Sequence, residues 1–358
     1  MRRRPQGRTA GLALLLAGAL VLAACGGGGG DGPSQGEQGT GEAEQPRIRV
    51  GLVYDVGGRG DQSFNDMAYA GLEQAKEEFG DRVEVQDAEP DAGGQNREDL
   101  LRTFAHQGYD LVIGVGLLFT DPITTVAKEY PDVKFAIVDS CPEEPLDNVA
   151  CLTFKEAEGS FLVGAAAALK TRTSKIGFVG GMKSALIERF EAGYRAGAKY
   201  VNPDVQVLVD YAGTTGEAFS NPTKGRELAL AQIRQGADVI YHAAGATGKG
   251  VFEAVKQEGK LAIGVDADQS LTAPDYADVI LTSMVKRVDV AVLDVIRSVV
   301  EGDFQPGLRQ YGLKEGGVGY ALNDKNRPMI EDITAQLDEI KQKILEGQIQ
   351  VPERPGDV

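Results

Sequence analysis

Polar and aromatic side chains follow the apolar segment Arg47–Asp55, and they are of the types that build small-molecule sites. The stretch Asp55–Asp61 carries three glycines that must break a strand, and Phe64 and Asn65 then open a helical pattern. A carboxylate accepts hydrogen bonds from hydroxyl or N–H groups, and an aromatic ring stacks on a base. The same residues also suit an ordinary strand-to-helix turn, with Phe64 in the core.

Four further residues of these types stand where other predicted strands end or helices begin. Asp121 lies in GVGLLFTDP, Phe219 follows the strand predicted at 206–213, and Asp266 and Lys286 close or follow later strands. Ligands of open α/β sheets bind at the carboxyl ends of the strands, so these side chains are expected to face one site. The alternative for Asp266 and Lys286 is a structural ion pair at a hinge.

Signals of catalysis are weak in this chain. GATGKG, at 245–250, has two residues between Gly245 and Gly248 where a phosphate-binding loop has four, and Gly250 replaces the required Ser or Thr. His106 and His242 lie far apart and accompany no nucleophile or metal-ligand pattern. We therefore predict no catalytic residue, no metal, no cofactor and no enzymatic activity.

Strand and helix patterns alternate along the chain, which predicts parallel sheets with helices on both faces. The predicted strands are 47–55, 110–116, 134–140, 175–181, 206–213, 239–245, 261–266 and 279–284. The predicted helices include 68–79, 97–107, 125–129, 156–170, 187–200, 225–235 and 250–258. Two sheets fit the length better than one. The apolar, alanine-rich helix 156–170 is too short to cross a membrane and is expected to be buried.

The N-terminus is typical of an exported lipoprotein. Four arginines precede a short apolar stretch, and Cys25 follows two alanines, which predicts a signal peptide over 1–24 and a lipid on the Cys25 thiol. A secretory signal without lipid is the alternative. Residues 25–46 are rich in Gly, Ser, Glu and Pro and are expected to form a flexible tether. The predicted location is the extracytoplasmic face of a bacterial cell membrane.

The net charge of −16 argues against nucleic acid as a partner. Of the three cysteines, Cys141 and Cys151 remain for a disulfide in an oxidising compartment. Two buried thiols are the alternative.

Seven blocks spread in order over Asp55–Asp324 resemble the basic membrane protein family, lipoproteins that bind purine nucleosides for an ABC importer. These blocks are DVGGRGDQSFNDMAYAGL, GVGLLFTDP, KEYPDVKFAIVDS, RFEAGYRAGAKYVNP, GKGVFEAVKQEGKLAIGVDADQ, LTSMVKRVDVAV and LKEGGVGYALND. The resemblance implies a type I periplasmic-binding-protein fold, in which two doubly wound parallel-sheet domains are joined by a hinge. We expect domain 1 over 47–154 with about 283–305, domain 2 over 155–282 with about 306–325, and a C-terminal helix and tail over 326–358.

The resemblance also implies roles for the candidate residues. Phe64 and Phe219 would stack on the two faces of the base, Asn65 and Asp121 would bond its polar edge, and Asp55 would complete the first-domain side. Asp266 would accept both ribose hydroxyls, and Lys286 would reach the ribose or the carboxylate. Around Phe219 the chain departs from the family pattern, with an expanded segment at 214–218 and Asn221 in place of an acid.

The expected function is that of a monomeric, lipid-anchored receptor that closes on a nucleoside and delivers it to an ABC permease. The resemblance implies a purine nucleoside. A receptor for a sugar or another polar metabolite is the first alternative. A nucleoside hydrolase is the second, and a sensor without a transport partner is a further one.

Overall fold

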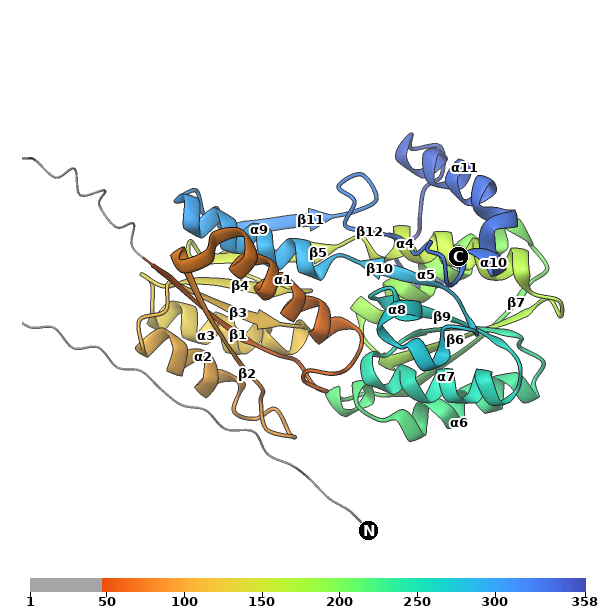
Figure 1. Cartoon of the computed structure of the whole chain (residues 1–358), viewed down its shortest axis with the longest axis horizontal. Helices are drawn as coiled ribbons and strands as arrows, with labels where there is room; N and C mark the ends of the chain where they lie inside the picture. The colour runs from red at the N-terminus through yellow and green to blue at the C-terminus, as the bar shows by residue number, and fades with distance from the viewer. Residues whose placement is uncertain (1–46) are drawn as a thin grey trace, which may run out of the picture. The chain divides into compact units, whose positions relative to one another are not determined.

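The computed structural model describes residues 47–358, so the predicted signal peptide, Cys25 and the tether lie outside the described residues. Within 47–358 the chain forms two six-stranded sheets, each flanked by helices (Figure 1). We call the part built on the sheet that contains the N-terminal strand the first lobe, and the other part the second lobe. No helix of this described part is long and apolar enough to span a membrane.

The first sheet is entirely parallel. Its spatial order is β11 (Gly307–Tyr311), β5 (Val149–Phe154), β4 (Lys134–Val138), β3 (Leu111–Val115), β1 (Ile48–Val53) and β2 (Val83–Ala88). The central strands β1, β3 and β4 read as apolar runs and are buried, as expected for strands covered on both faces. Helices α1 (Phe64–Phe79) and α9 (Val288–Glu301) pack together, as do α2 (Arg97–His106) and α3 (Thr120–Glu129).

The second sheet repeats this plan with one antiparallel edge. Its order is β12 (Val318–Tyr320), β10 (Ile280–Lys286), β9 (Leu261–Asp266), β8 (Val239–Ala243), β6 (Lys175–Met182) and β7 (Gln206–Gly213), with β12 antiparallel to β10. Helices α4 (Glu156–Lys170) and α5 (Ala185–Val201) pair, and so do α6 (Pro222–Arg234) and α7 (Gly248–Gln257). Shorter helices are α8 (Gln269–Thr272) and α10 (Arg327–Ile330), and α11 (Thr334–Leu345) lies near the C-terminus.

Helix α4 is a core helix, as its sequence predicts. Twelve of its fifteen residues are buried. Gly164 of α4 lies against the backbone of Tyr194 in α5, and Gly193 and Gly197 of α5 lie against the backbone of α4. A Cβ atom at any of these glycines would collide with the facing helix, so the small residues set the close approach of the two helices.

Within the described part, the chain crosses between the lobes three times. The crossings run from β5 to α4, from β10 to α9, and from β11 to β12. Backbone hydrogen bonds join these segments side by side, from the Lys155 N–H to the Tyr311 carbonyl and from the Arg287 N–H to the Gly317 carbonyl. These three segments form the hinge.

Two expected boundaries near this hinge need correction. Residues 283–286 belong to the second sheet, not to domain 1, because β10 stays paired with β9 as far as Val285. Residues 307–311 belong to the first sheet, not to domain 2, because β11 pairs with β5 along its whole length. After β10 the chain therefore returns to the first lobe, and after β11 it leaves this lobe again, each a few residues later than expected from the sequence.

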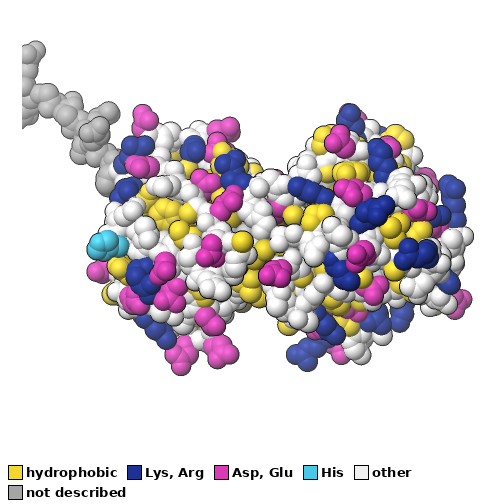
Figure 2. Space-filling model, turned by 90° about the horizontal axis from the view of Figure 1, so that it is seen from below, with side chains coloured by type: hydrophobic (Ala, Val, Ile, Leu, Met, Phe, Trp, Pro, Cys, Tyr) yellow, Lys and Arg dark blue, Asp and Glu magenta, His cyan; other side chains and the backbone are white. Residues whose placement is uncertain are grey.

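The acidic surplus lies mostly in the first lobe. Residues 47–154 and 288–311 contain 25 Asp and Glu against 11 Lys and Arg, whereas the rest of the described chain is nearly balanced, with 24 against 22. Figure 2 shows Asp and Glu along the lower edge of the left-hand lobe, and Lys and Arg along the lower edge of the right-hand lobe. Repulsion of polyanions is therefore expected chiefly at the first lobe.

Candidate functional site

A cavity lies between the lobes, where strand ends of the two sheets face each other. It contains about 530 Å³ of space not filled by protein atoms. The first lobe lines it with Asp55, Val56, Asp61, Phe64, Asn65, Gly116, Leu117 and Asp139, and the second lobe with Leu186, Ile187, Phe190, Phe219, Ala243, Ala244, Gly245, Val265, Asp266 and Lys286. Six of the seven residues expected to bind the ligand are in this list.

Asp61 organises the loop between β1 and α1. Its carboxylate accepts hydrogen bonds from the backbone N–H groups of Ser63 at 2.9 Å and Asn65 at 2.9 Å, so it satisfies free donors at the start of α1. The Asn65 side chain accepts from the Asp55 N–H at 2.9 Å and donates to Asp61 at 3.1 Å. The Asn65 amide therefore holds the loop in shape while it lines the cavity.

Three phenylalanine rings line the cavity, and glycines make room for one of them. Phe219 fills the space above Gly181, where a Cβ atom would collide with its ring. Phe64 opens α1, and the Lys286 ammonium lies 4.9 Å from its ring centroid. Phe190 of α5, 2% exposed, lies 5.4 Å from the same ammonium. The cavity thus offers aromatic faces from both lobes.

Asp266 connects the lobes through a direct hydrogen bond. Its carboxylate accepts from the Ser63 hydroxyl at 2.5 Å, although the two residues are 203 positions apart. The backbone of Asp266 has a φ of +63°, a left-handed conformation that is uncommon for a residue with a side chain. This conformation at the end of β9 is a local strain of the kind that gathers at functional sites.

Lys286 is held by two carboxylates at the back of the cavity. Its ammonium bonds Asp139, at the end of β4, and lies 3.9 Å from Glu156, the first residue of α4. Arg189 donates to the other side of Glu156 at 2.9 Å. The alternative of a structural ion pair between Lys286 and Asp266 is not found, because Asp139 is the bonded partner of Lys286.

Burial raises the pKa of several carboxyl groups in and beside the cavity toward neutral pH. Removal from water raises the pKa of Asp55 and of Asp266 to about 6 and that of Asp61 to about 7. Burial also raises the pKa of Glu156. For Lys286 burial opposes the charged form, but the carboxylates of Asp139, Glu156 and Asp266 outweigh it and raise the pKa.

Asp121 does not line the cavity. A short 3-10 turn over Leu117–Phe119 follows β3, and Asp121 comes after it as an exposed residue in the first turn of α3. Gly116 and Leu117 occupy the strand end instead. The expected bond from Asp121 to a ligand has no support in this geometry, and we leave Asp121 out of the site.

Asp61, Asp139 and Phe190 also line the cavity, but they were not among the residues expected to bind the ligand. Asp139 directly follows β4, just as Asp55 comes soon after β1. A search for acidic residues at the ends of strands would therefore have found Asp139 within KFAIVDS. Asp61 is the last residue of the glycine-containing stretch Asp55–Asp61. Phe190 lies in the middle of a helix pattern, and no local signal separates it from a core residue.

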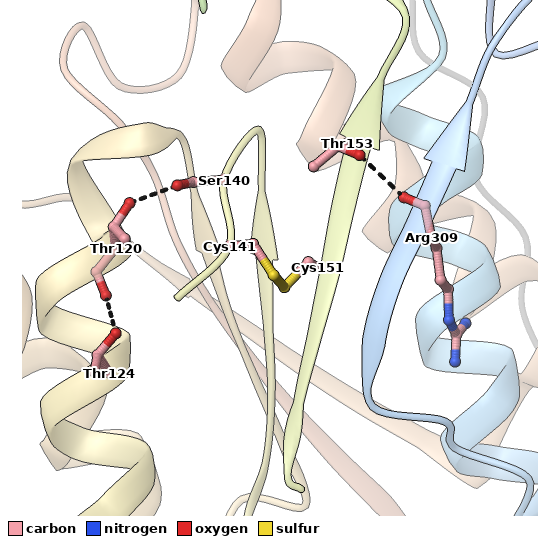
Figure 3. The surroundings of a disulfide bond; sticks show 7 residues. All are labelled: Thr120, Thr124, Ser140, Cys141, Cys151, Thr153 and Arg309. Carbon is pink, nitrogen blue, oxygen red and sulfur yellow. Dashed lines mark hydrogen bonds between the residues drawn. A yellow bond between two sulfur atoms is a disulfide. The ribbon is translucent and has the colours of Figure 1, made fainter. Parts of the chain in front are cut away.

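Other expected features lie outside the cavity. Cys141 and Cys151 form a disulfide between the segment after β4 and strand β5 (Figure 3). Lys249 of the GATGKG stretch donates to the Gly60 carbonyl at 2.6 Å and so ties α7 to the glycine loop. His242 is buried at the end of β8 and hydrogen-bonds Gln269, and burial lowers its pKa to about 4.

Sequence comparison relates the chain to solute-binding proteins. The model of a family described as ABC transporter substrate-binding protein PnrA-like matches residues 48–355. A Listeria innocua protein called CD4+ T-cell-stimulating antigen is 40% identical, with 96% of this chain and 98% of that protein covered. The ABC transporter nucleoside-binding protein BmpA of Lactococcus lactis is 35% identical, with 96% and 97% covered.

Structural comparison agrees. A solute-binding protein of an ABC transporter system from Aeropyrum pernix superposes with a TM-score of 0.76 at 36% identity, over 85% of this chain and 94% of that one. The arabinose-binding component from a Shewanella species reaches 0.57 at 15% identity, over 82% and 98%, which shows the fold alone. The expected type I periplasmic-binding-protein fold is confirmed.

Proposed function

Since the chain belongs to the family of PnrA-like ABC transporter substrate-binding proteins, we propose that its interdomain cavity captures a nucleoside, most readily a purine nucleoside. A transporter partner and a small-molecule ligand follow from the family itself. The nature of the ligand, the residues that hold it and the lipid anchor are our proposals.

The observation that carries the proposal is the placement of Phe64 and Phe219 in one cavity, from opposite lobes, with Asp266 at its wall. Two aromatic faces suit a flat base, and stacking on such a ring is worth roughly 1 to 3 kcal/mol per base in single-strand binders. Carboxylates suit the ribose hydroxyls and the N–H groups of a purine. The nucleoside-binding relative BmpA supports the same assignment.

Binding would be coupled to closure of the lobes. Ser63, Gln62 and Gly60 of the first lobe already bond Asp266, Gln269 and Lys249 of the second. A ligand that touches both sides binds this closed arrangement better than an open one and shifts the population toward it. The permease would then meet the closed form.

A ligand panel tests the proposal. The full mature protein is followed by thermal denaturation with purine and pyrimidine nucleosides, free bases and sugars. A ligand at about 100 times its Kd adds about 2.7 kcal/mol to the free energy of unfolding. Stabilisation by nucleosides supports the proposal, and mass analysis of co-purified ligand identifies the physiological one. Stabilisation by sugars alone would replace it with the sugar receptor.

The lipid anchor is the second part of the proposal. Cys25 follows a short apolar stretch and two alanines, and an uncharacterized lipoprotein of Pyrococcus abyssi is 39% identical over 87% of this chain and 77% of that protein. Mass analysis of the N-terminal peptide from membranes should find a diacylated Cys25. Cys25→Ser should release the protein from the membrane. A protein processed elsewhere and free of lipid contradicts the anchor.

A further inference from the structure

A second hollow adjoins the proposed nucleoside cavity. It is lined in part by Leu117, Asp139 and Leu186, which also line the cavity. We call it the side pocket. The two spaces therefore lie side by side, with these three residues between them.

One wall of the side pocket is fixed by the first lobe. It is formed by Ser140, Cys141 and Thr153. The disulfide ties Cys141 to Cys151, the Ser140 hydroxyl bonds Thr120 at 2.6 Å, and the Thr153 hydroxyl donates to the Arg309 carbonyl at 3.4 Å (Figure 3). These bonds fix the positions of the Ser140 and Thr153 side chains in this wall.

The opposite wall comes from the start of α5. It consists of Ser184, Ala185 and Arg189. Ala185 is exposed and small, so a larger side chain there would fill the pocket without entering the core. The guanidinium of Arg189 is engaged by Glu156, and its side chain is 29% exposed.

Asp139 stands at the junction with an unused acceptor. One of its oxygens takes the Lys286 ammonium, and the other, Oδ1, is buried without a hydrogen-bond partner among the described residues. A buried acceptor left unpaired is unfavourable, because it has lost its hydrogen bonds to water. A ligand group that donates a hydrogen bond at the junction would remove this cost.

We propose that the side pocket is a subsite for a substituent on the sugar end of a nucleoside. The inference rests on the proposed function, in which Asp266 and Lys286 hold the sugar. The 5′ carbon would then face Asp139, and a group attached to it would pass between Leu117 and Leu186 into the side pocket.

The charges select the chemistry of this substituent. Asp139 offers a free acceptor, and the cations Arg189 and Lys286 are already paired with Glu156 and Asp139. A phosphate would meet these carboxylates without a free cation, whereas an N–H donor meets Oδ1 of Asp139. The ligand class is a 5′-amino-5′-deoxynucleoside that carries a small polar group on the nitrogen.

Calorimetric titration of the full mature protein tests the subsite with three probes: a parent nucleoside, its 5′-(2-hydroxyethylamino)-5′-deoxy derivative and its 5′-monophosphate. We expect the derivative to bind within about tenfold of the parent and the phosphate more weakly than both. In Ala185→Trp, the indole fills the pocket, so the derivative should lose about tenfold or more while the parent keeps its affinity.

The control is Ala335→Trp, an equally exposed alanine in the first turn of α11, far along the chain from the cavity. It should change neither affinity. The inference is overturned if the wild-type protein binds the derivative more than about tenfold weaker than the parent, if the phosphate binds best, or if Ala185→Trp affects both ligands alike. Failure of the parent itself to bind would instead overturn the proposed function.

Discussion

Lys286 of the second lobe is bonded to Asp139 of the first, and the two side chains are only 2% and 4% exposed. This pair joins the ends of β10 and β4 beside the hinge. Breaking a buried pair from one side leaves an uncompensated charge, which costs more than the pair itself contributes. The pair therefore ties the stability of the molecule to the geometry of the cavity.

Replacement of Lys286 tests this relationship. Lys286→Met should lower the free energy of unfolding by about 3 to 5 kcal/mol, because Asp139 and Glu156 lose their shared cation. Chemical denaturation measures the loss. Lys256→Met removes an ion pair with Asp278 whose side chains are 43% and 64% exposed, and should cost under about 1 kcal/mol. Adding Asp139→Asn to Lys286→Met should recover part of the loss; a purely additive double variant would contradict the pairing.

Phe64→Ala should weaken nucleoside binding by about 2 kcal/mol, since one stacking face is lost. Phe64→Leu keeps an apolar side chain but no ring, and should lose nearly as much affinity. Titration calorimetry with the preferred nucleoside measures both. Phe79→Ala, at the other end of α1, is the control for general effects on the helix. Unchanged affinity in Phe64→Ala would exclude Phe64 from the clamp.

Asp266→Asn should weaken ribosides much more than free bases, because only ribosides present two neighbouring hydroxyls. Asn also tolerates the left-handed backbone at this position. Competition binding with a nucleoside and its base measures the difference, and Asp268→Asn, two residues further along, is the control. Equal losses for nucleoside and base would place the ribose elsewhere.

The raised pKa values of Asp55, Asp61 and Asp266 predict opposite pH trends for stability and binding. In the unfolded chain these groups titrate near 3.8, whereas in the folded protein they titrate at about 6, 7 and 6. Between these values the folded state binds more protons, so stability rises as pH falls from about 8 toward 5. Ligand affinity should fall over the same range, because protonated Asp266 and Asp55 accept fewer hydrogen bonds.

Denaturation and calorimetry across this pH range measure the two trends. Asp266→Asn should flatten part of both curves near pH 6, since one titrating group is gone. If the affinity instead rises as the pH falls, these carboxyl groups bind the ligand in their protonated form, as hydrogen-bond donors. That result would contradict the proposal.

Loss of the disulfide should cost roughly 2 to 3 kcal/mol, because it closes a short loop in the unfolded chain. The wild-type melting temperature should fall in dithiothreitol, and the double variant Cys141→Ser, Cys151→Ser should melt at the reduced value with or without the reductant. A melting temperature that ignores the reductant in the wild type would mean that the bond adds no stability.

Most buried elements of the fold were predictable from the sequence, but the buried strand β5 was not predicted. Strands at 206–213 and 261–266 and the helix at 156–170 have their expected bounds. The edge strands β2 and β11 were not predicted, because each is largely polar or alternates in burial and gains its partners only from distant parts of the chain. The short strand β12 was not predicted for the same reason.

Part of the site was predictable for a similar reason. The carboxyl ends of parallel strands meet at one edge of a sheet, so acidic residues at strand ends come together. This rule located Asp55 and Asp266, and it would also have located Asp139. Asp121 does not line the cavity, because a short turn separates it from β3 and its side chain is exposed. Phe190 depends on how α5 lies across the cavity, which no local pattern encodes.

The order in which the chain builds the first lobe affects how the lobe can fold during synthesis. Strand β11 and helix α9, which complete that lobe, are made after most of the second lobe. A nascent chain that ends before residue 288 has an open edge on β5 and an uncovered α1. The first lobe can therefore reach its native form only after residue 311 has been made, and truncated products should be sensitive to proteolysis.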